Sequence, residues 1–338
     1  MREKGLIYHL VAFLVVAIWG STFISTKLLL LSGLTPAQIF TLRFIIAYIL
    51  LLGYSIGLTR TKTDSGIRVS QCQSDANTDT KAFDSPSQSV SVRCKRLPRL
   101  FAGSWHDELL MLLLGISGGT LYFLAENTAM NYTTTTNTSL IVSLSPLVAT
   151  ALITIFYRSQ RLSRLQTLGT LMAALGVTVV VLNGHFVLHL SPLGDSLAFL
   201  AALCWGFYSL MMIPAGERYD TLFVTRKVFF YGLLAMIPYY VCRPEEAGIF
   251  ISPSTFHPSP STVFNLLFLG CIASMGCFLA WNWTMKKLGA VVATSYIYFN
   301  PVTTIIFAWL ILSEQITVYF LIGTLLILVG MYLADRRR

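Results

Sequence analysis

Long apolar runs separated by short polar segments dominate the chain of 338 residues. A helix that crosses a bilayer needs about 20 mainly apolar residues, because each residue advances the helix by about 1.5 Å. None of the runs alternates in polarity over about ten residues, which is the pattern of strands in a membrane barrel. The pattern therefore predicts an all-α integral membrane protein with ten transmembrane helices, at 6–31, 35–57, 107–130, 133–157, 164–183, 193–215, 221–242, 261–285, 288–312 and 316–335.

The first apolar run follows Arg2 and Lys4, as the apolar part of a secretory signal peptide does. It is longer than a typical signal region, and no small-residue cleavage site lies between Trp19 and Leu31. We interpret this run as a retained transmembrane helix.

One connection, 58–106, is much longer than the others and is rich in Ser, Thr, Gln and Asp. Such a composition does not bury enough apolar surface to offset the entropy lost on ordering. We expect a flexible cytoplasmic loop. A tolerated insertion is the favoured interpretation, with a regulatory or partner-binding segment as the alternative.

Composition and charge agree with a membrane protein. The chain is 55% apolar and 12% charged, whereas soluble domains carry about a quarter charged residues. This argues against a soluble enzyme, a nucleic-acid-binding domain and a disordered scaffold. With the N-terminus in the cytoplasm, 19 of the 24 Lys and Arg residues fall in cytoplasmic segments and only Arg243 falls in an outer loop. Positive charge gathers on the cytoplasmic side of membrane proteins, so we expect both termini to be cytoplasmic.

The chain contains an internal repeat. Residues 115–130 match residues 270–285 at six of sixteen positions, at an offset of 155 residues. Equivalent residues recur in the same order over five helices. The pairs are Gly115/Gly270, Phe123/Phe278, Leu124/Leu279, Ala125/Ala280, Asn127/Asn282, Met130/Met285 and Pro146/Pro301, preceded by Trp19/Trp205, Gly20/Gly206 and Arg43/Arg226.

An odd number of helices per repeat inverts the second half relative to the first in the membrane. The sequence therefore predicts two inverted five-helix repeats, 1–183 and 193–338, with 58–106 inserted in the first. Inverted repeats are the architecture of alternating-access carriers, which bind substrate near the midplane where the halves meet.

With these features the sequence resembles the EamA-type carriers of the drug/metabolite transporter superfamily. The resemblance rests on the 5+5 repeat, the Trp-Gly pair, the Arg and the Pro of each half, and it covers nearly the whole chain except 58–106. Members often carry an acidic residue in the turn before the last helix of each repeat. Glu314 matches this pattern, whereas the first repeat has Gln160. The resemblance implies a ten-helix secondary carrier, commonly an exporter of amino acids or related metabolites.

Glu126 is the only carboxylate deep within a predicted span. An ionisable group in a membrane costs about 2.5–3.5 kcal/mol on insertion scales. Tyr122 lies one helical turn away and Asn127 lies beside it. We hypothesise that Glu126 binds a substrate amine or takes up a coupling proton. The alternative is a structural carboxyl, neutral or hydrogen-bonded to a neighbouring helix.

Arg43 lies about 12 Å inside the second helix at 1.5 Å per residue. It is a candidate to anchor a substrate carboxylate or to pair with Glu126. The alternative for Arg43 is snorkelling to the headgroups, which is the favoured interpretation of Arg226 with Lys227 beside it.

Aromatic, amide and hydroxyl residues within the predicted helices are further candidates to line a substrate cavity. Alternatively, Trp and Tyr belong to interface belts, and Asn or Thr can hydrogen-bond across helices. The candidates are Trp19, Thr22, Trp205, Asn282, Tyr296 and Asn300.

Proline and glycine add two packing predictions. Pro146 and Pro301 are expected to bend the fourth helix of each half. Small residues allow helices to approach closely, and those expected to do so are Gly169, Ala173, Gly176, Gly323 and Gly330.

The sequence predicts a secondary active transporter in a bacterial cytoplasmic membrane that exports amino acids or related compounds. Its expected partners are a small-molecule substrate, membrane lipid and a coupling proton, with no nucleic acid. His185 and His189 have metal-ligand spacing but no supporting carboxylate, and no phosphate-binding glycine loop occurs. We therefore expect no metal, no cofactor and no enzyme activity. The rivals are a membrane transferase or hydrolase and a non-transporting sensor or scaffold with the carrier fold.

Overall fold

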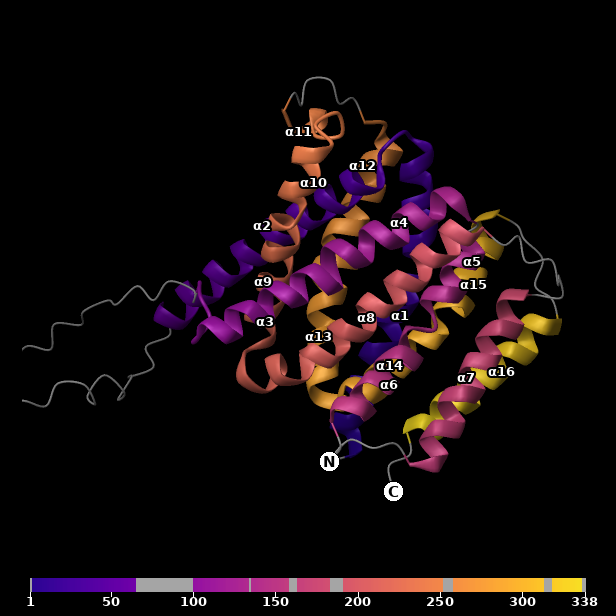
Figure 1. Cartoon of the computed structure of the whole chain (residues 1–338). Helices are drawn as coiled ribbons and strands as arrows, with labels where there is room; N and C mark the ends of the chain where they lie inside the picture. Colours follow the sequence, from indigo (N-terminus) through magenta and orange to yellow (C-terminus); the bar gives the residue numbers. More distant parts are fainter. Residues whose placement is uncertain are drawn as a thin grey trace, which may run out of the picture.

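A computed structural model describes residues 2–64, 100–133, 135–157, 163–182, 191–251, 258–312 and 318–335. Within these ranges the chain is helical apart from short turns, and no strand occurs. The predictions for Gln160, Glu314 and the two histidines fall outside these ranges. The helices pack side by side, and both chain termini lie at the same end of the bundle (Figure 1).

The first half of the chain forms helices that follow the predicted spans closely. α2 continues seven residues past the predicted end at 57, into the stretch predicted to be a loop. The elements are α1 (Arg2–Leu31), α2 (Pro36–Asp64), α3 (Trp105–Gly115), the π-helix η1 (Ile116–Leu121), α4 (Tyr122–Tyr132), α5 (Thr135–Val142), α6 (Ser145–Phe156) and α7 (Arg164–Leu182).

The second half is also helical in every described segment. It comprises α8 (Pro192–Arg218), α9 (Thr221–Leu234), α10 (Met236–Cys242), α11 (Gly248–Ile251), α12 (Pro260–Leu267), the π-helix η4 (Phe268–Gly276), α13 (Cys277–Leu288), α14 (Ala290–Ser295), the 3₁₀ helix η5 (Tyr296–Phe299), α15 (Asn300–Leu312) and α16 (Val318–Asp335).

Length and composition make the chain a multi-pass membrane protein. Leu175 and Leu325, for instance, are 64% and 63% exposed on the outside of the bundle, where lipid replaces water as the solvent. The all-helical fold is thus confirmed over the described residues, while the count of ten helices stays a prediction. Seven described helices are long and apolar enough to cross a membrane: Leu6–Leu31, Pro36–Gly57, Trp105–Tyr132, Pro192–Arg218, Thr221–Cys242, Pro260–Leu288 and Ala290–Phe307.

Helix starts follow from local side chains. The Ser104 hydroxyl accepts a hydrogen bond from the Asp107 backbone N–H at the start of α3, and Ser191, Asp220 and Ser259 cap α8, α9 and α12 in the same way. Each cap satisfies a backbone donor that has no partner within the helix.

Regular α-helix is interrupted just before each of the two repeat-related prolines. α5 ends at Val142, and Pro146 lies in the first turn of α6. In the second half η5 separates α14 from α15, whose second residue is Pro301. The predicted distortions at Pro146 and Pro301 are therefore confirmed.

The principal helix contacts join early and late parts of the chain. α4 and α6 pack on α8, α1 packs on α13 and α15, and α2 packs on η4 and α9. α7 and α16 lie side by side at one edge of the bundle (Figure 1). A Cβ added at Gly169 would approach the Gly330 carbonyl oxygen to 2.6 Å, and one at Gly176 the Gly323 carbonyl oxygen to 2.8 Å. The predicted close packing at these glycines is confirmed.

Candidate functional site

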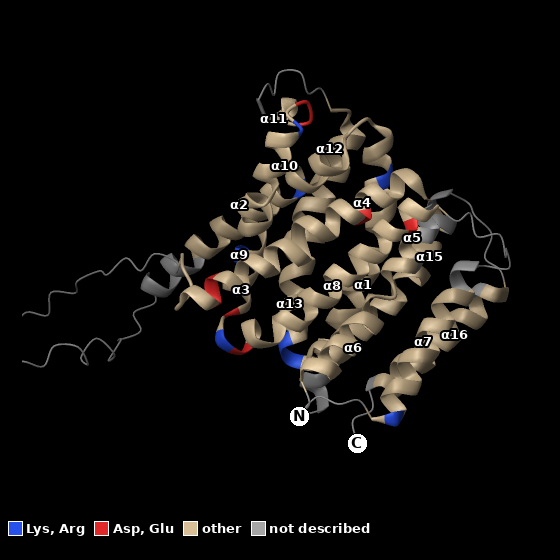
Figure 2. Ribbon diagram, in the orientation of Figure 1, with Lys and Arg blue, Asp and Glu red and all other residues tan. Residues whose placement is uncertain are grey.

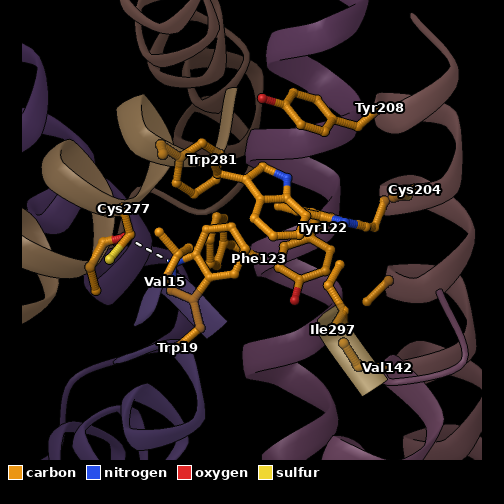
Figure 3. Close-up of a cluster of buried hydrophobic side chains, with 14 of the residues drawn as sticks. Val15, Trp19, Tyr122, Phe123, Val142, Cys204, Tyr208, Cys277, Trp281 and Ile297 are labelled. Carbon is orange, nitrogen blue, oxygen red and sulfur yellow. Dashed lines mark hydrogen bonds between the residues drawn. The ribbon is translucent and has the colours of Figure 1, made fainter. Parts of the chain in front are cut away.

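A small cavity lies inside the bundle, where helices from both halves of the chain meet. Its volume is about 30 Å³, which is room for a water molecule or two. Figure 3 shows Trp19, Tyr122, Phe123 and Trp281 clustered between the helices in this region. The lining residues are Trp19, Thr22, Phe23, Arg43, Tyr122, Phe123, Glu126, Val142, Ser145, Trp205, Phe278, Ile297 and Asn300.

Glu126 brings a carboxyl group to this cavity from α4. Its side chain is buried, at 8% exposure, and the Tyr122 hydroxyl donates a hydrogen bond to Glu126 Oε1 at 2.9 Å. The two residues are four apart on one helix, so helix geometry alone brings them together. The predicted neighbourhood of Tyr122 and Glu126 is confirmed.

Arg43 brings a guanidinium group to the same cavity from α2. Arg43 Nε donates a hydrogen bond to the Ser274 hydroxyl at 2.8 Å, and its Cζ lies 4.3 Å from the centre of the Phe123 ring. The side chain is only 2% exposed. Arg43 therefore does not snorkel to a membrane face, and aromatic contact compensates part of its desolvation.

Arg43 and Glu126 line one cavity, yet they are not among the three ion pairs formed by the described residues. A buried charge without a counterion is costly. An arrangement with a cation on one wall and a carboxyl on another is suited to a ligand that carries both charges.

Six aromatic side chains contribute to the walls of the cavity: Trp19, Phe23, Tyr122, Phe123, Trp205 and Phe278. Trp19 packs edge-on against Trp205, with ring centres 5.4 Å apart, and against Phe278 at 5.7 Å. Tyr122 packs on Trp205 at 5.1 Å. The Trp19 indole N–H donates to the Ala273 carbonyl oxygen at 3.0 Å, which fixes the ring in place. These walls are mostly apolar, as those of ligand pockets usually are.

Two polar atoms at the cavity have no protein partner among the described residues. They are the indole N–H of Trp205, a donor, and Oδ1 of Asn300, an acceptor. Buried polar atoms in native structures are usually hydrogen-bonded. Both atoms are thus available to a polar ligand.

Much of the wall consists of residues that occupy equivalent positions in the two halves of the sequence. The equivalence fails at the polar positions, because Tyr122 corresponds to Cys277 and Glu126 to Trp281 at an offset of 155 residues. The charge is therefore one-sided although the walls are paired. The paired lining residues are Phe123/Phe278, Val142/Ile297 and Ser145/Asn300 at that offset, together with Trp19/Trp205.

Family comparison identifies the chain. The model of the EamA-like transporter family matches residues 94–182 and 192–334. The chain belongs to the EamA-like transporter family. The resemblance seen in the sequence is thereby confirmed.

The curated relatives of this EamA-like transporter are themselves transporters. An uncharacterized transporter of Archaeoglobus fulgidus is 27% identical over 70% of this chain and 78% of its own length. The uncharacterized transporter YoaV of Bacillus subtilis is 24% identical over 67% and 73%. A probable terminal-alkyne amino-acid exporter of Streptantibioticus cattleyicolor is 24% identical over 68% and 74%.

A solved crystal structure shares the fold. It aligns with 99% of this chain and 97% of its own length, with a TM-score of 0.64 and 19% sequence identity. The EamA-like chain thus shares its fold with a solved structure and has relatives named as transporters.

Three predicted site residues of the EamA-like transporter lie away from the cavity. Asn282 accepts from the Tyr208 hydroxyl at 2.5 Å and donates to Thr225 at 2.9 Å, so its amide joins α13 to α8 and α9. Asn127 donates to the Pro36 carbonyl oxygen at 3.4 Å. The Tyr296 hydroxyl pairs with His9 Nδ1 at 2.6 Å. The structure places the other seven predicted residues at the cavity: Glu126, Arg43, Tyr122, Trp19, Thr22, Trp205 and Asn300.

Several lining residues were not selected from the sequence. Phe123 and Phe278 were recognised as repeat partners but not as site residues, because apolar side chains have no distinctive chemistry. Ser274, which fixes Arg43, lies 231 positions away in sequence. The repeat offset was the available signal, since it relates the missed residues Val142 and Ile297 to each other and the missed Ser145 to the predicted Asn300.

The described residues contain no group of three or more His, Cys, Asp or Glu side chains that could hold a metal ion. The chemistry of the cavity lies in one guanidinium, one carboxyl and their aromatic surroundings. This set can bind, orient and exchange protons with a small polar ligand.

Proposed function

We propose that this protein is a secondary active carrier that exports an amino acid or a related small zwitterion by alternating access. The observation that carries the proposal is that Arg43 and Glu126 line one small cavity inside the bundle without forming an ion pair with each other. Substrate then supplies the missing counterions, with its carboxylate against Arg43 and its ammonium group against Glu126.

Aromatic walls and unpartnered polar atoms complete the proposed substrate site. The rings of Trp19, Trp205 and Phe278 receive the apolar part of the substrate. The Trp205 indole N–H and Asn300 Oδ1 supply a further donor and acceptor. The amino-acid exporter of Streptantibioticus cattleyicolor supports this substrate class, because it is a relative over two thirds of this chain.

Equivalent features in the two halves of the chain support alternating access as the mechanism. The π-helices η1 and η4 cover 116–121 and 268–276, so that η1 corresponds to 271–276 at the offset of 155 residues. The cavity is lined by equivalent residues from both halves. Carriers with inverted repeats bind substrate at such an interface near the midplane. We accordingly propose ten transmembrane helices in two inverted repeats.

The size of the cavity implies movement during transport. About 30 Å³ is much smaller than any amino acid. The side chains around Arg43 and Glu126 must therefore separate when substrate enters, and the structure corresponds to a closed state of the cycle. We place both termini in the cytoplasm and the carrier in a bacterial cytoplasmic membrane, on the strength of the asymmetric distribution of Lys and Arg.

Glu126 is also the proposed coupling group. Its carboxyl can hold either a proton or the substrate ammonium group, and Tyr122 is placed to donate to the ionised form at 2.9 Å. Competition between proton and substrate at one carboxyl gives exchange of one for the other across the membrane. Outward movement of substrate is then driven by inward movement of protons.

Flux measurements in proteoliposomes test this function. Purified protein is reconstituted, and counterflow of a panel of labelled amino acids is measured with and without a proton gradient. Substrate-dependent flux that is accelerated by the gradient and abolished in Arg43→Gln supports the proposal. The absence of flux for every zwitterion under any gradient contradicts it.

The non-transporting scaffold is separated from the carrier by one deletion. A chain that lacks 66–98 keeps α2 complete to Asp64 and retains the α3 cap at Ser104. If the protein is a carrier, amino-acid flux persists after this deletion. If it is a scaffold that acts through this segment, the deletion abolishes its cellular function, and neither the full-length nor the shortened protein shows flux.

A further inference from the structure

A second buried charge cluster lies at the start of α3, outside the proposed substrate cavity. Glu108 accepts hydrogen bonds from the Lys227 ammonium group and the Tyr231 hydroxyl, and its other oxygen accepts from the Ala102 backbone N–H at 2.7 Å. Both oxygens of this carboxylate are therefore engaged. Lys227 and Tyr231 belong to α9, so the cluster joins two helices that are far apart in the sequence.

Aromatic rings surround the Lys227 ammonium group. It lies 5.0 Å from the centre of the Phe101 ring and 5.1 Å from that of Tyr231, with the Phe223 and Phe230 rings at 5.8 and 5.9 Å. The side chain is 6% exposed. Attraction to the ring faces adds to the ion pair and excludes water from it.

The neighbouring carboxylate, Asp107, extends the cluster to two further helices. Asp107 Oδ1 accepts from the Arg218 guanidinium at 2.6 Å, and Oδ2 accepts from the Tyr219 hydroxyl at 2.9 Å. The Tyr219 carbonyl oxygen in turn accepts from Lys286 Nζ at 2.9 Å. The first turn of α3 is thus tied to the ends of α8 and α13 as well as to α9.

The opposite end of the bundle has no equivalent network among the described residues. At the offset of 155 residues Asp107 and Glu108 correspond to Thr262 and Val263. The remaining ion pair, Arg243 with Glu246, is 3.9 Å long and lies within one connection, so it ties no helices together. Contacts between helices at that end include the Thr41 and Tyr240 hydroxyls at 2.9 Å and a hydrogen bond from Lys27 Nζ to the Met130 carbonyl oxygen at 3.1 Å, and none that the described residues show there is an ion pair between two helices.

Charged residues gather at the start of α3, the turn between α8 and α9 and the end of α13, at the end of the bundle that holds both chain termini (Figure 2). We propose that the ion pairs Glu108–Lys227 and Asp107–Arg218 form a gate that closes the terminal-side end of the carrier. The gate parts once in each transport cycle to expose the cavity to that side. This assignment rests on the proposed carrier function.

The two pairs contribute unequally to the gate. Arg218 is 59% exposed, so water and salt weaken its attraction to Asp107. Lys227 is buried and the Glu108 side chain is only 14% exposed, so removal of either leaves a poorly solvated charge without its partner when the end is closed. When the terminal-side end is open, the remaining charged side chain is solvated by water. Loss of one buried partner therefore shifts the population toward the state that is open on the terminal side.

Sided thiol labelling tests the gate without any substrate. Cys204 and Cys277 are buried beside the cavity. A chain that keeps Cys204 alone, with Ser at the other cysteines, is treated with a membrane-impermeant thiol reagent from each side of sealed vesicles. In Glu108→Gln we expect labelling of Cys204 from the terminal side to rise about tenfold, and labelling from the opposite side to fall.

Matched controls separate a gate from general loosening. Arg243→Gln removes an exposed ion pair at the opposite end and should leave both labelling rates unchanged. Asp107→Asn should shift labelling in the same direction as Glu108→Gln but by less, and it serves where Glu108→Gln fails to fold. Unchanged labelling, or an equal rise from both sides, overturns the gate.

The gate and the proposed function fail in different ways. A wild-type protein without amino-acid flux contradicts the substrate site but leaves the labelling result standing. Normal flux with no change of labelling in either carboxylate variant contradicts the gate alone.

Discussion

Two buried charge clusters in this protein differ in how their charges are compensated. At the terminal-side end Glu108 is paired with Lys227 and has hydrogen bonds to both oxygens. In the cavity Arg43 and Glu126 face the same space, yet they bond to Ser274 and Tyr122 and not to each other.

The contrast assigns different roles to the two clusters. A paired cluster is complete without ligand and stabilises one arrangement of helices. An unpaired cluster tolerates its desolvation cost only through neighbours such as the Phe123 ring, and it gains most when a ligand of complementary charge arrives. Substitutions in the first should therefore change stability and conformation, and substitutions in the second should change transport.

The largest effect on stability is expected from Lys227→Met, which leaves Glu108 buried without its counterion. Breaking a buried pair costs about 3–5 kcal/mol. Unfolding of the detergent-solubilised protein, followed by denaturant titration, measures this loss. Arg243→Gln is the control, and a loss below about 1 kcal/mol in Lys227→Met would show that the pair is effectively solvated.

Among substitutions in α4, the largest effect on transport is expected from Glu126→Gln. The amide keeps the shape of the side chain but neither attracts an ammonium group nor exchanges a proton. Amino-acid flux in proteoliposomes should fall about 100-fold, which corresponds to about 2.7 kcal/mol, and the remaining flux should no longer depend on pH.

Stability should change little in Glu126→Gln, in contrast to Lys227→Met. Glu217→Gln is the matched control, since Glu217 is an exposed acidic residue at the end of α8. If Glu126→Gln showed full flux with the wild-type pH dependence, the role of Glu126 in transport would be contradicted, and with it the proposed functional difference between the two clusters.

A packing variant sharpens the comparison because it touches neither cluster. A Cβ at Gly330 would approach the Ala173 backbone nitrogen to 2.5 Å between α16 and α7. Gly330→Ala should cost about 1–3 kcal/mol of stability through overpacking. Flux per folded molecule should equal that of the wild type, as measured on the monodisperse fraction. A lower flux per folded molecule would instead indicate that the contact between α7 and α16 takes part in transport.

Tyr122→Phe is expected to have a moderate effect on transport. It removes one hydrogen bond to the carboxyl of Glu126, a bond worth about 0.5–1.5 kcal/mol, or more where the acceptor is charged. The midpoint of the pH profile of flux should move upward, because the ionised carboxylate loses a donor. Counterflow between pH 5 and 9 measures the shift, and an unchanged midpoint would show that Tyr122 does not act on the coupling group.

The smallest effect on stability is expected from Arg218→Gln. Its ion pair with Asp107 is exposed on the Arg218 side, and such pairs contribute about 0–1 kcal/mol. The same denaturant titration compares it with Lys227→Met. A loss as large as that of Lys227→Met would make Asp107 the main attachment of α3.

The sequence by itself determined the membrane class, because helices in lipid must satisfy their own backbone and need long apolar runs. It also placed Tyr122 beside Glu126, since residues four apart share a helix face. The small residues between α7 and α16 were recognisable because close approach of two helices requires them.

Tertiary structure decided which distant residues meet. The interpretation that Arg226 snorkels is wrong, because Arg226 is buried and donates to the Ser55 hydroxyl. Lys227 beside it pairs with Glu108, 119 residues away in the sequence. Apolar helices are covered on every side, by protein or by lipid, so composition does not reveal which face is turned inward. Only the packing of α2, α4 and α9 shows that Lys227 forms a direct ion pair with Glu108, whereas Arg43 and Glu126 line one cavity without such a contact.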